Sequence, residues 1–407
     1  MSQSPDIARP RATPWGLVVL LGSLTAFSPM STDMYLAAFP AIGLELHASA
    51  GQQQATLAAF LAGMAMGQFL YGPASDRFGR RGPILVGIGV YVAASIACAL
   101  ATSPDGLIVA RFIQALGGCA GAVVARAVVR DQFDHTETAR MLSLLTLIMG
   151  LAPILAPMVG AFVLALAGWR AIFWVLAAFG LSVGLAVFLR LAESRGEETA
   201  AQARAESPLR AYRALIGEPR LIGYALAGAL NGAVLFTYIS SSSNLMIETF
   251  GFAPAVYSAI FACNAFAVIG AGQLNRFLLR RMTPDQVLRR ASLVAVSFGL
   301  LLMLAAATGW GGRWTVLPLL FAALGSYGLM AGNTMAGALS IDSRRAGSVS
   351  ALMGGMSFGA GALASWAGGA LHDGTARPMA AVMLVCLLGS TAALWGLALP
   401  RRRQPAG

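Results

Sequence analysis

Two charged side chains of opposite sign, Asp33 and Arg111, lie within otherwise uncharged apolar stretches of helical length. A charge at the centre of a lipid bilayer costs at least about 2.5–3.5 kcal/mol, so a charge retained there usually marks a functional site. A carboxylate can bind and release a proton, and a nearby arginine changes how readily it does so. We therefore expect Asp33 to carry a proton and Arg111 to assist it. The alternative is an ion pair that only holds two helices together.

Asp33 and Arg111 are expected at the same depth in the membrane. At 1.5 Å per residue, about six residues between each charge and the outer end of its stretch put both side chains roughly 9 Å below the outer surface. The matching depths predict that the two side chains pair. The pairing also requires the two helices to be neighbours, which the sequence does not show.

The elements that carry these charges are apolar stretches too long for barrel strands, which would be alternating segments of about 10 residues. Hydrophobic residues make up 57% of the 407 residues and charged residues 11%, with a mean hydropathy of +0.71. A soluble domain carries about 25% charged residues, and a membrane helix needs about 20 apolar residues. Twelve stretches qualify: 15–32, 52–75, 82–104, 106–125, 141–169, 171–189, 221–247, 249–275, 291–312, 314–341, 346–371 and 378–400. They predict an all-α membrane protein with 12 transmembrane helices.

The basic residues predict how the chain is oriented in the membrane. All 28 are arginines, and 24 of them fall in the two tails and the loops on one side, whereas only Arg170, Arg313 and Arg377 fall on the other. Because cytoplasmic loops are rich in arginine, both termini are expected in the cytoplasm. The net charge of +11 follows from this loop bias, so we expect no nucleic-acid partner.

A long polar segment divides the chain into two equal sets of stretches. We expect a cytoplasmic tail at 1–14, a six-helix half at 15–190, a cytoplasmic linker at 191–220, a second six-helix half at 221–400 and a tail at 401–407. The linker is rich in Arg, Glu and Ala, which is typical of a solvated connection with a short helix on the membrane surface rather than of a ligand site. Transporters built from two related halves bind substrate near the midplane between them.

The loop after the second stretch has a distinctive spacing of glycine, aspartate and arginine. It contains Gly72, Asp76, Arg77, Gly79, Arg80 and Arg81. This spacing closely resembles the G-x-x-x-D-R-x-G-R-[RK] signature of the major facilitator superfamily. The resemblance implies the twelve-helix fold of that family. It also implies a latch in which Asp76 contacts a loop arginine and the start of a helix in the second half, near Ala346 and Gly347. Carboxylate contacts with a helix N-terminus contribute about 0.3–1 kcal/mol, or up to about 2 kcal/mol when partly buried.

Two further stretches resemble motifs of the same superfamily. Arg111 and Gln114 are similar to the R-x-x-Q-G motif, whose arginine is linked to proton transfer, although Ala115 replaces its glycine. Pro153, Pro157 and Gly160 resemble the antiporter motif of exporters. Two prolines four residues apart kink a helix, and small residues between them allow close packing. An ordinary bent packing helix is the alternative.

The first stretch narrows the resemblance to one branch. Ser31, Asp33, Met34, Tyr35 and Pro40 are similar to the S-x-D-M-Y-L-P-A-x-P opening of the bicyclomycin and chloramphenicol resistance group of drug:proton antiporters, with Ala37 in place of a proline. The segments that begin at Arg126, Gly168, Phe261 and Asn275 also resemble that group. The resemblance covers essentially the whole chain.

Substrate contacts are expected from polar and aromatic residues that share helical faces. They are Tyr35, Gln114, Asn231, Tyr238, Phe261, Asn264 and Asn333. Each of them could equally hold two helices together, because polar groups often hydrogen-bond between membrane helices.

These observations favour a proton-coupled exporter of small amphipathic drugs in the bacterial inner membrane, working as a monomer by alternating access. A transporter of a physiological metabolite such as an amino acid or sugar is the alternative. A membrane enzyme is disfavoured because Asp33 is the only carboxylate in a stretch and the three histidines are scattered. The four cysteines show no metal-ligand spacing, so neither metal nor cofactor is expected. Without lysine the chain cannot form a nucleotide-binding G-x-x-x-x-G-K-[ST] loop.

Overall fold

The computed structural model describes residues 15–133, 135–197, 201, 207–342 and 345–399. The expected tails, 1–14 and 401–407, lie outside the described residues. All regular secondary structure in the described residues is helical.

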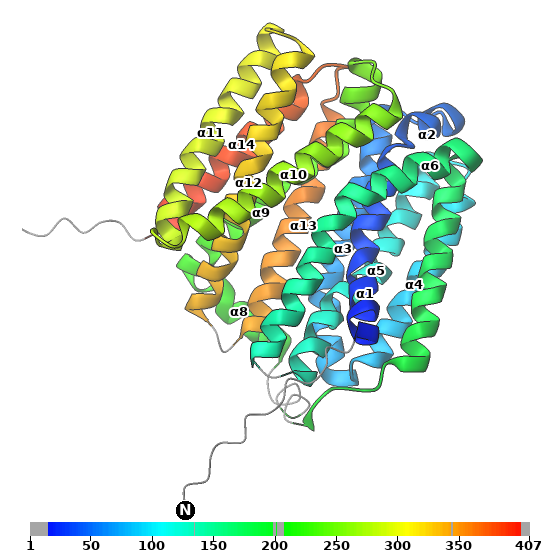
Figure 1. The fold of residues 1–407 in the computed structure, drawn as a ribbon, viewed down its shortest axis with the longest axis vertical. Coiled ribbons are helices and arrows are strands. Elements are labelled where there is room, and N and C mark those ends of the chain that lie inside the picture. Colours follow the sequence, from blue (N-terminus) through cyan, green and yellow to red (C-terminus); the bar gives the residue numbers. More distant parts are fainter. Residues whose placement is uncertain (1–14, 134, 198–200, 202–206, 343–344, 400–407) are drawn as a thin grey trace, which may run out of the picture.

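The first half contains six helices in the chain order of Figure 1. They are α1 (Trp15–Leu36), α2 (Phe39–Leu46), α3 (Ala50–Phe78), α4 (Arg81–Ala99), α5 (Pro104–Gln132) and α6 (His135–Arg190). The short helix α2 lies at the outer end of the bundle, next to the start of α3. The long helix α6 is interrupted at Gly168, where φ is 77° and ψ is 176°. The interruption divides α6 into two membrane-crossing parts.

A short helix within the expected linker comes first, and the second half follows with six long helices. They are α8 (Pro208–Ile216), α9 (Pro219–Ser243), α10 (Pro254–Leu278), α11 (Pro284–Thr308), α12 (Arg313–Ile341), α13 (Ala346–Ala370) and α14 (Arg377–Ala393). Two π-helical turns, η1 (Asn244–Thr249) and η2 (Leu394–Ala398), extend α9 and α14.

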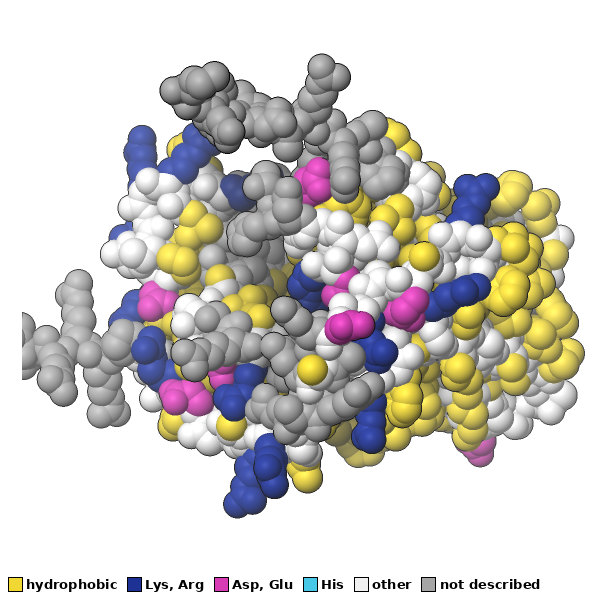
Figure 2. Space-filling view, turned by 90° about the horizontal axis from the view of Figure 1, so that it is seen from below, with side chains coloured by type: hydrophobic (Ala, Val, Ile, Leu, Met, Phe, Trp, Pro, Cys, Tyr) yellow, Lys and Arg dark blue, Asp and Glu magenta, His cyan; other side chains and the backbone are white. Residues whose placement is uncertain are grey.

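The helices confirm the expected twelve-span membrane fold. Among the described residues, ten helices are long and apolar enough to cross a membrane, with α6 counted once. Its division at Gly168 provides one more span, and α13, which is rich in Gly and Ser, provides another. Figure 2 shows arginine and acidic side chains on the face where α8 lies, with hydrophobic side chains around its sides. This distribution agrees with the positive-inside rule and makes this face the cytoplasmic one.

The two halves meet along α3 and α13, which run side by side in the centre of Figure 1. Helix α13 also packs on α9 of its own half, and α6 of the first half packs on α10 of the second. Near the outer surface, a Cβ atom at Gly51 would lie 3.0 Å from the carbonyl oxygen of Gly369, so the two backbones touch there. The outer ends of the halves are therefore closely packed.

Candidate functional site

Asp33 is buried near the outer end of α1 and faces the second half. Its side chain is 3% exposed, and it accepts a 2.9 Å hydrogen bond from the Thr32 hydroxyl. Its charge acts on the hydroxyl groups of Tyr238 and Tyr257 in α9 and α10. Pro29 lies one turn earlier and lacks the N–H that would bond within the helix. A carboxylate from the first half thus lies at the junction with the second.

Arg111 lies in an aromatic cage within the first half. Its guanidinium carbon is 4.3 Å from the ring centre of Phe60, 4.6 Å from that of Tyr35 and 5.8 Å from that of Phe173. The side chain is fully buried, and its Nη1 donates to Gln114 Oε1 at 2.5 Å. Ring faces attract a desolvated cation by about 2 kcal/mol or more. The aromatic cage therefore supplies much of the stabilisation that an anion would otherwise provide.

The expected ion pair between Asp33 and Arg111 is absent, so that prediction was wrong. The only side-chain partner of Asp33 is Thr32, and the Nε and Nη2 atoms of Arg111 have no hydrogen-bond partner among the described residues. Tyr35 reaches the guanidinium from α1, and Asp33 is two positions earlier. Residues two apart on a helix point in nearly opposite directions. In the structure, α1 presents Tyr35 rather than Asp33 to Arg111.

The helix with the antiporter motif packs directly behind Asp33. A Cβ atom at Gly160 would lie 2.7 Å from the carbonyl carbon of Met34, so only glycine lets α6 approach the backbone of α1 this closely. Pro157 is buried, and its carbonyl oxygen lies 3.5 Å from the Ser258 hydroxyl of α10. The side chain of Pro153 lies outside the described residues. This part of α6 thus touches both the Asp33 helix and the second half.

Three of the expected substrate residues form one aromatic and polar group in the second half. Tyr238 and Phe261 stack with ring centres 5.6 Å apart, and Asn264 Nδ2 donates to the Tyr238 hydroxyl at 2.8 Å. Tyr257 adds a third ring, 5.9 Å from that of Phe261. These four residues, here called the second-half cluster, are all buried. Rings and a neutral amide beside a carboxylate make a suitable environment for an amphipathic organic molecule.

The other expected substrate residues have different surroundings. Tyr35 and Gln114 belong to the aromatic cage and its hydrogen bonds, and Gln114 Nε2 donates onward to Ser95 at 2.8 Å. Asn333 exchanges amide hydrogen bonds with Asn275, which connects α12 to α10. Asn231 is 1% exposed, and neither its amide nitrogen nor its amide oxygen has a partner among the described residues. Of these four residues, Asn231 alone has a polar side chain with no hydrogen-bond partner among the described residues.

Polar side chains join the two halves at their outer ends. The Ser241 hydroxyl donates to Gln54 Oε1 at 3.3 Å, and Asn244 Nδ2 donates to Gln53 Oε1 at 3.1 Å. Both bonds connect α3 with α9 and its π-helical extension. Together with the Gly51 and Gly369 contact, they close the molecule on the outer side.

The signature loop forms a compact ionic network at the cytoplasmic end of the first half. The Arg80 side chain, 3% exposed, pairs with Asp76 and binds Asp131 of α5 through its Nε at 2.7 Å. Burial alone would lower the pKa of Arg80, but its bonds to Asp131 and Asp76 raise the pKa above the ordinary value. Gly79 has a φ of +94°, which permits the turn between α3 and α4.

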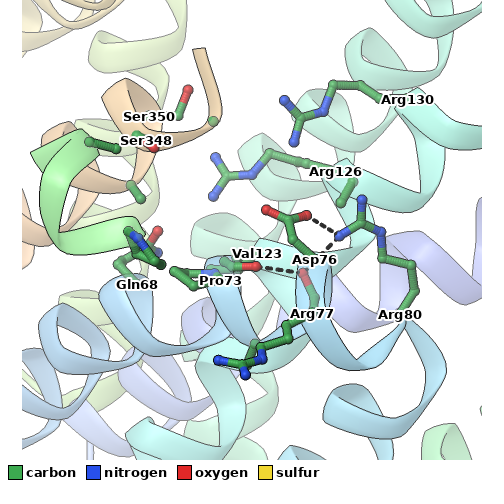
Figure 3. Close-up of a pocket in the computed structure, with 18 of the residues that line it drawn as sticks. Gln68, Pro73, Asp76, Arg77, Arg80, Val123, Arg126, Arg130, Ser348 and Ser350 are labelled. Carbon is green, nitrogen blue, oxygen red and sulfur yellow. Dashed lines mark hydrogen bonds and ion pairs between the residues drawn. The ribbon is translucent and has the colours of Figure 1, made fainter. Parts of the chain in front are cut away.

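A cavity of about 760 Å³ lies beside this network and between the two halves. Asp76, Arg77 and Gly72 line it on the first half, and Gly347 and Ser348 at the start of α13 line it on the second (Figure 3). A Cβ atom at Gly72 would meet no described atom within 4 Å, so Gly72 does not mark a close helix contact here. The reason is that the halves are apart at this end. The structure is therefore closed outside and hollow toward the cytoplasm.

Comparison with known proteins identifies the family. Residues 21–365 match the model described as Major Facilitator Superfamily.

The chain belongs to the major facilitator superfamily.

Its relatives agree with the branch that the motifs indicated. The chain is 33% identical over 392 residues to the uncharacterized MFS-type transporter YdgK of Bacillus subtilis, covering 95% of this chain and 96% of the relative. It is 29% identical to a bicyclomycin resistance protein homolog of Haemophilus influenzae, over 93% of this chain and 95% of the relative. The crystal structure of a D-xylose-proton symporter superposes with a TM-score of 0.72 at 13% identity, over 95% of this chain and 97% of the symporter. This similarity shows a shared fold. The protein is thus a multi-pass transporter of the bacterial inner membrane.

One residue of the facilitator's cytoplasmic network was missed by sequence reasoning. Glu193, in the segment treated as a plain linker, accepts hydrogen bonds from the backbone N–H groups of Arg80 and Arg81 at 2.8 and 3.2 Å. Partial burial opposes its ionisation, but these bonds and those from Arg195 and Ser194 outweigh burial, so the pKa of Glu193 lies below its usual value. The 113 residues that separate Glu193 from Arg80 hide the contact from any local pattern.

Proposed function

We propose that this transporter exports small amphipathic drugs across the inner membrane in exchange for protons. The relative named for bicyclomycin resistance supports drugs as the substrate class. The observation that carries the proposal is the position of Asp33: a buried carboxylate beside the aromatic second-half cluster, where a proton and an organic molecule would meet.

Exchange follows if the proton and the drug compete for the site around Asp33. A drug that binds better to the ionised carboxylate displaces the proton, and protonation from the outer side then favours release of the drug. Tyr238 and Phe261 would supply the apolar contact area, and Asn264 and Asn231 the polar contacts. A ligand shifts a conformational equilibrium only through contacts that differ between the two states. Contacts from both halves meet that requirement.

Alternating access would be provided by movement of the halves 15–190 and 221–400 about the linker 191–220. We propose that Asp76 closes the cytoplasmic side by approaching the N-terminus of α13. In the present structure the Asp76 side chain is 45% exposed and lies on the cavity surface, paired with Arg80. It is therefore available for a new contact when the cavity closes.

The proposed function is tested by efflux from proteoliposomes that contain the purified full chain. A panel of bicyclomycin, chloramphenicol and other amphipathic drugs is compared with a panel of amino acids and sugars, with and without an imposed pH gradient. We expect drug movement that increases with the gradient. Gradient-dependent movement of amino acids or sugars, with no drug moved, would replace the proposal with metabolite transport.

The latch is tested with the substitution Asp76→Asn. Loss of a carboxylate contact with a helix N-terminus weakens the closed cytoplasmic side by about 1–2 kcal/mol, roughly a 5–30-fold change in population. Spin labels at Phe78→Cys and Phe277→Cys, in a background without native cysteines, report the cytoplasmic opening. We expect longer distances in Asp76→Asn and unchanged distances in Asp285→Asn, which alters a carboxylate outside the cavity. Identical distributions for Asp76→Asn and the parent would refute the latch.

A further inference from the structure

Two arginines of the cytoplasmic cavity have no role in the proposed exchange. Arg126 and Arg130 lie one helical turn apart on α5, and both line the cavity. Both side chains are exposed to it, and neither has a hydrogen bond or ion pair with any described residue. Like charges four residues apart on a helix repel each other. The fold therefore maintains two unneutralised guanidinium groups inside a hollow.

The carboxylates that line the same cavity are already engaged. Asp76 and Asp131, the two acidic residues of the cavity lining, both bind Arg80. Five arginines line the cavity with them, so the lining carries an excess of positive charge. Among the described residues that line the cavity, every carboxylate is therefore already paired with Arg80.

The opposite side of the cavity is also suited to an anion. Helix α13 begins at Ala346, and no side chain of the described residues caps its first N–H groups. Uncapped N–H groups and the helix dipole make such an end favourable for negative charge. Gly347, Ser348 and Ser350 line the cavity there, and Figure 3 shows Arg126 extending into the space between α5 and this segment. Two electropositive surfaces thus face each other across one cavity.

We infer that this cavity binds an oxyanion, a phosphate or carboxylate group, held by Arg126 and Arg130 and facing the start of α13. The planar guanidinium fork of arginine matches the geometry of both groups and can donate two parallel hydrogen bonds. The Ser348 and Ser350 hydroxyls can add donors from the second half. The bound group would neutralise two charges that otherwise oppose the approach of the halves. The site is separate from Asp33, so it can fail while the proposed exchange stands.

The oxyanion could belong to a soluble anion or to the headgroup of an anionic lipid, and two measurements distinguish these sources. In the first, inorganic phosphate is titrated into the full chain in an uncharged detergent, with chloride keeping the ionic strength constant, and thermal unfolding is followed. In the second, the chain is taken from nanodiscs that contain phosphatidylglycerol, and retained lipid is counted by native mass spectrometry.

The double variant Arg126→Gln/Arg130→Gln should weaken phosphate binding, or lipid retention, by about tenfold or more, because charge-assisted hydrogen bonds are lost. The matched control is Arg280→Gln/Arg281→Gln, which removes two exposed arginines from the same side of the membrane but outside the cavity. We expect it to bind like the parent. If the double variant does not fold, the single variant Arg126→Gln should show a weaker loss of the same kind.

Loss confined to the first measurement identifies a soluble anion, and loss confined to the second identifies a lipid headgroup. The inference is overturned if the unaltered chain shows neither phosphate-specific stabilisation nor lipid retention. It is equally overturned if the double variant binds phosphate and retains lipid as well as the parent does. The same holds if the control variant loses as much phosphate binding or lipid retention as the double variant.

Discussion

The two halves share a fold but differ in what they place inside the membrane. The first half contains Asp33 and Arg111, charged residues buried within its membrane-spanning helices, whereas the second half presents the neutral amides and rings of Asn231, Asn264, Tyr238 and Phe261. Charges in the membrane are costly and neutral amides less so. We propose from this difference that the first half handles the proton and that the second half contributes most of the contacts with the organic substrate.

The same contrast holds at the cytoplasmic ends. In the first half, Arg80 binds Asp76 and Asp131 after the turn from α3. In the second half, Asn275 exchanges neutral hydrogen bonds with Asn333 between α10 and α12. An uncharged amide pair has no carboxylate to offer to the opposite half. The latch is therefore expected on one side of the molecule only.

The largest effect should come from removing the carboxylate of the first half. One proton exchanged for each drug molecule supports about a tenfold drug gradient for each unit of pH difference. In Asp33→Asn this accumulation should vanish, while exchange of labelled for unlabelled drug continues because the second-half cluster is intact. Asp105→Asn, which alters an exposed carboxylate at the start of α5, should accumulate drug normally. Full accumulation by Asp33→Asn vesicles would contradict the division between the halves.

Asp33 and Arg111 also show how far the sequence predicts this site. Hydropathy predicted the spans, and the glycine and aspartate spacing predicted the turn at Gly79, because both depend on nearby residues. The helical rise predicts only the depth of each charge. It does not predict the direction of each side chain, because that depends on the rotation of α1 against its neighbours, which places Tyr35 on Arg111. Glu193 could not be predicted either, because its partners belong to a distant loop.

A smaller effect is expected from the second half. Tyr238→Phe removes the hydroxyl that accepts the Asn264 hydrogen bond while keeping the ring. The loss of one hydrogen bond of about 1 kcal/mol should weaken drug affinity roughly fivefold without changing the ratio of protons to drug. Tyr224→Phe, which loses a bond to Asp285 at the cytoplasmic end, is the control and should keep its affinity. Altered stoichiometry in Tyr238→Phe would mean that the second half also handles the proton.

The aromatic cage around Arg111 provides a further test of the comparison between the two halves. An ion pair with Asp33 would contribute about 1–3 pH units to the midpoint of pH-dependent drug binding. Because Arg111 and Asp33 are not paired, Arg111→Met, which keeps an apolar side chain in the cage, should shift that midpoint by less than about one unit. The measurement is drug binding by the parent and by Arg111→Met at a series of pH values. A midpoint shift larger than about one pH unit would show that the two charges are coupled.

The smallest effect is expected at Glu193. Glu193→Gln weakens charge-assisted bonds at an exposed site, so apparent stability should fall by about 0.5–1 kcal/mol at neutral pH. The folded-state pKa of Glu193 is below its unfolded value, so this stabilisation is present above the unfolded pKa and is lost as pH falls through the folded one. Thermal unfolding of the parent and the variant should therefore converge in acid. The control is Glu197→Gln, which alters an exposed glutamate four residues later and should unfold at the same temperature as the parent at every pH. If the unfolding temperatures of Glu193→Gln and the parent differ by the same amount at every pH, ionisation of Glu193 is not the cause.

The central claim, that Asp33 exchanges its proton for the drug, is tested most directly by counting protons released on binding. The purified transporter is mixed in weakly buffered solution with a drug that the efflux panel identifies, and a pH indicator records the release over a range of pH. The parent and Arg111→Met should each release about one proton per drug bound where Asp33 is protonated beforehand. Asp33→Asn should bind the drug and release none. Equal proton release by Asp33→Asn and the parent would contradict the account.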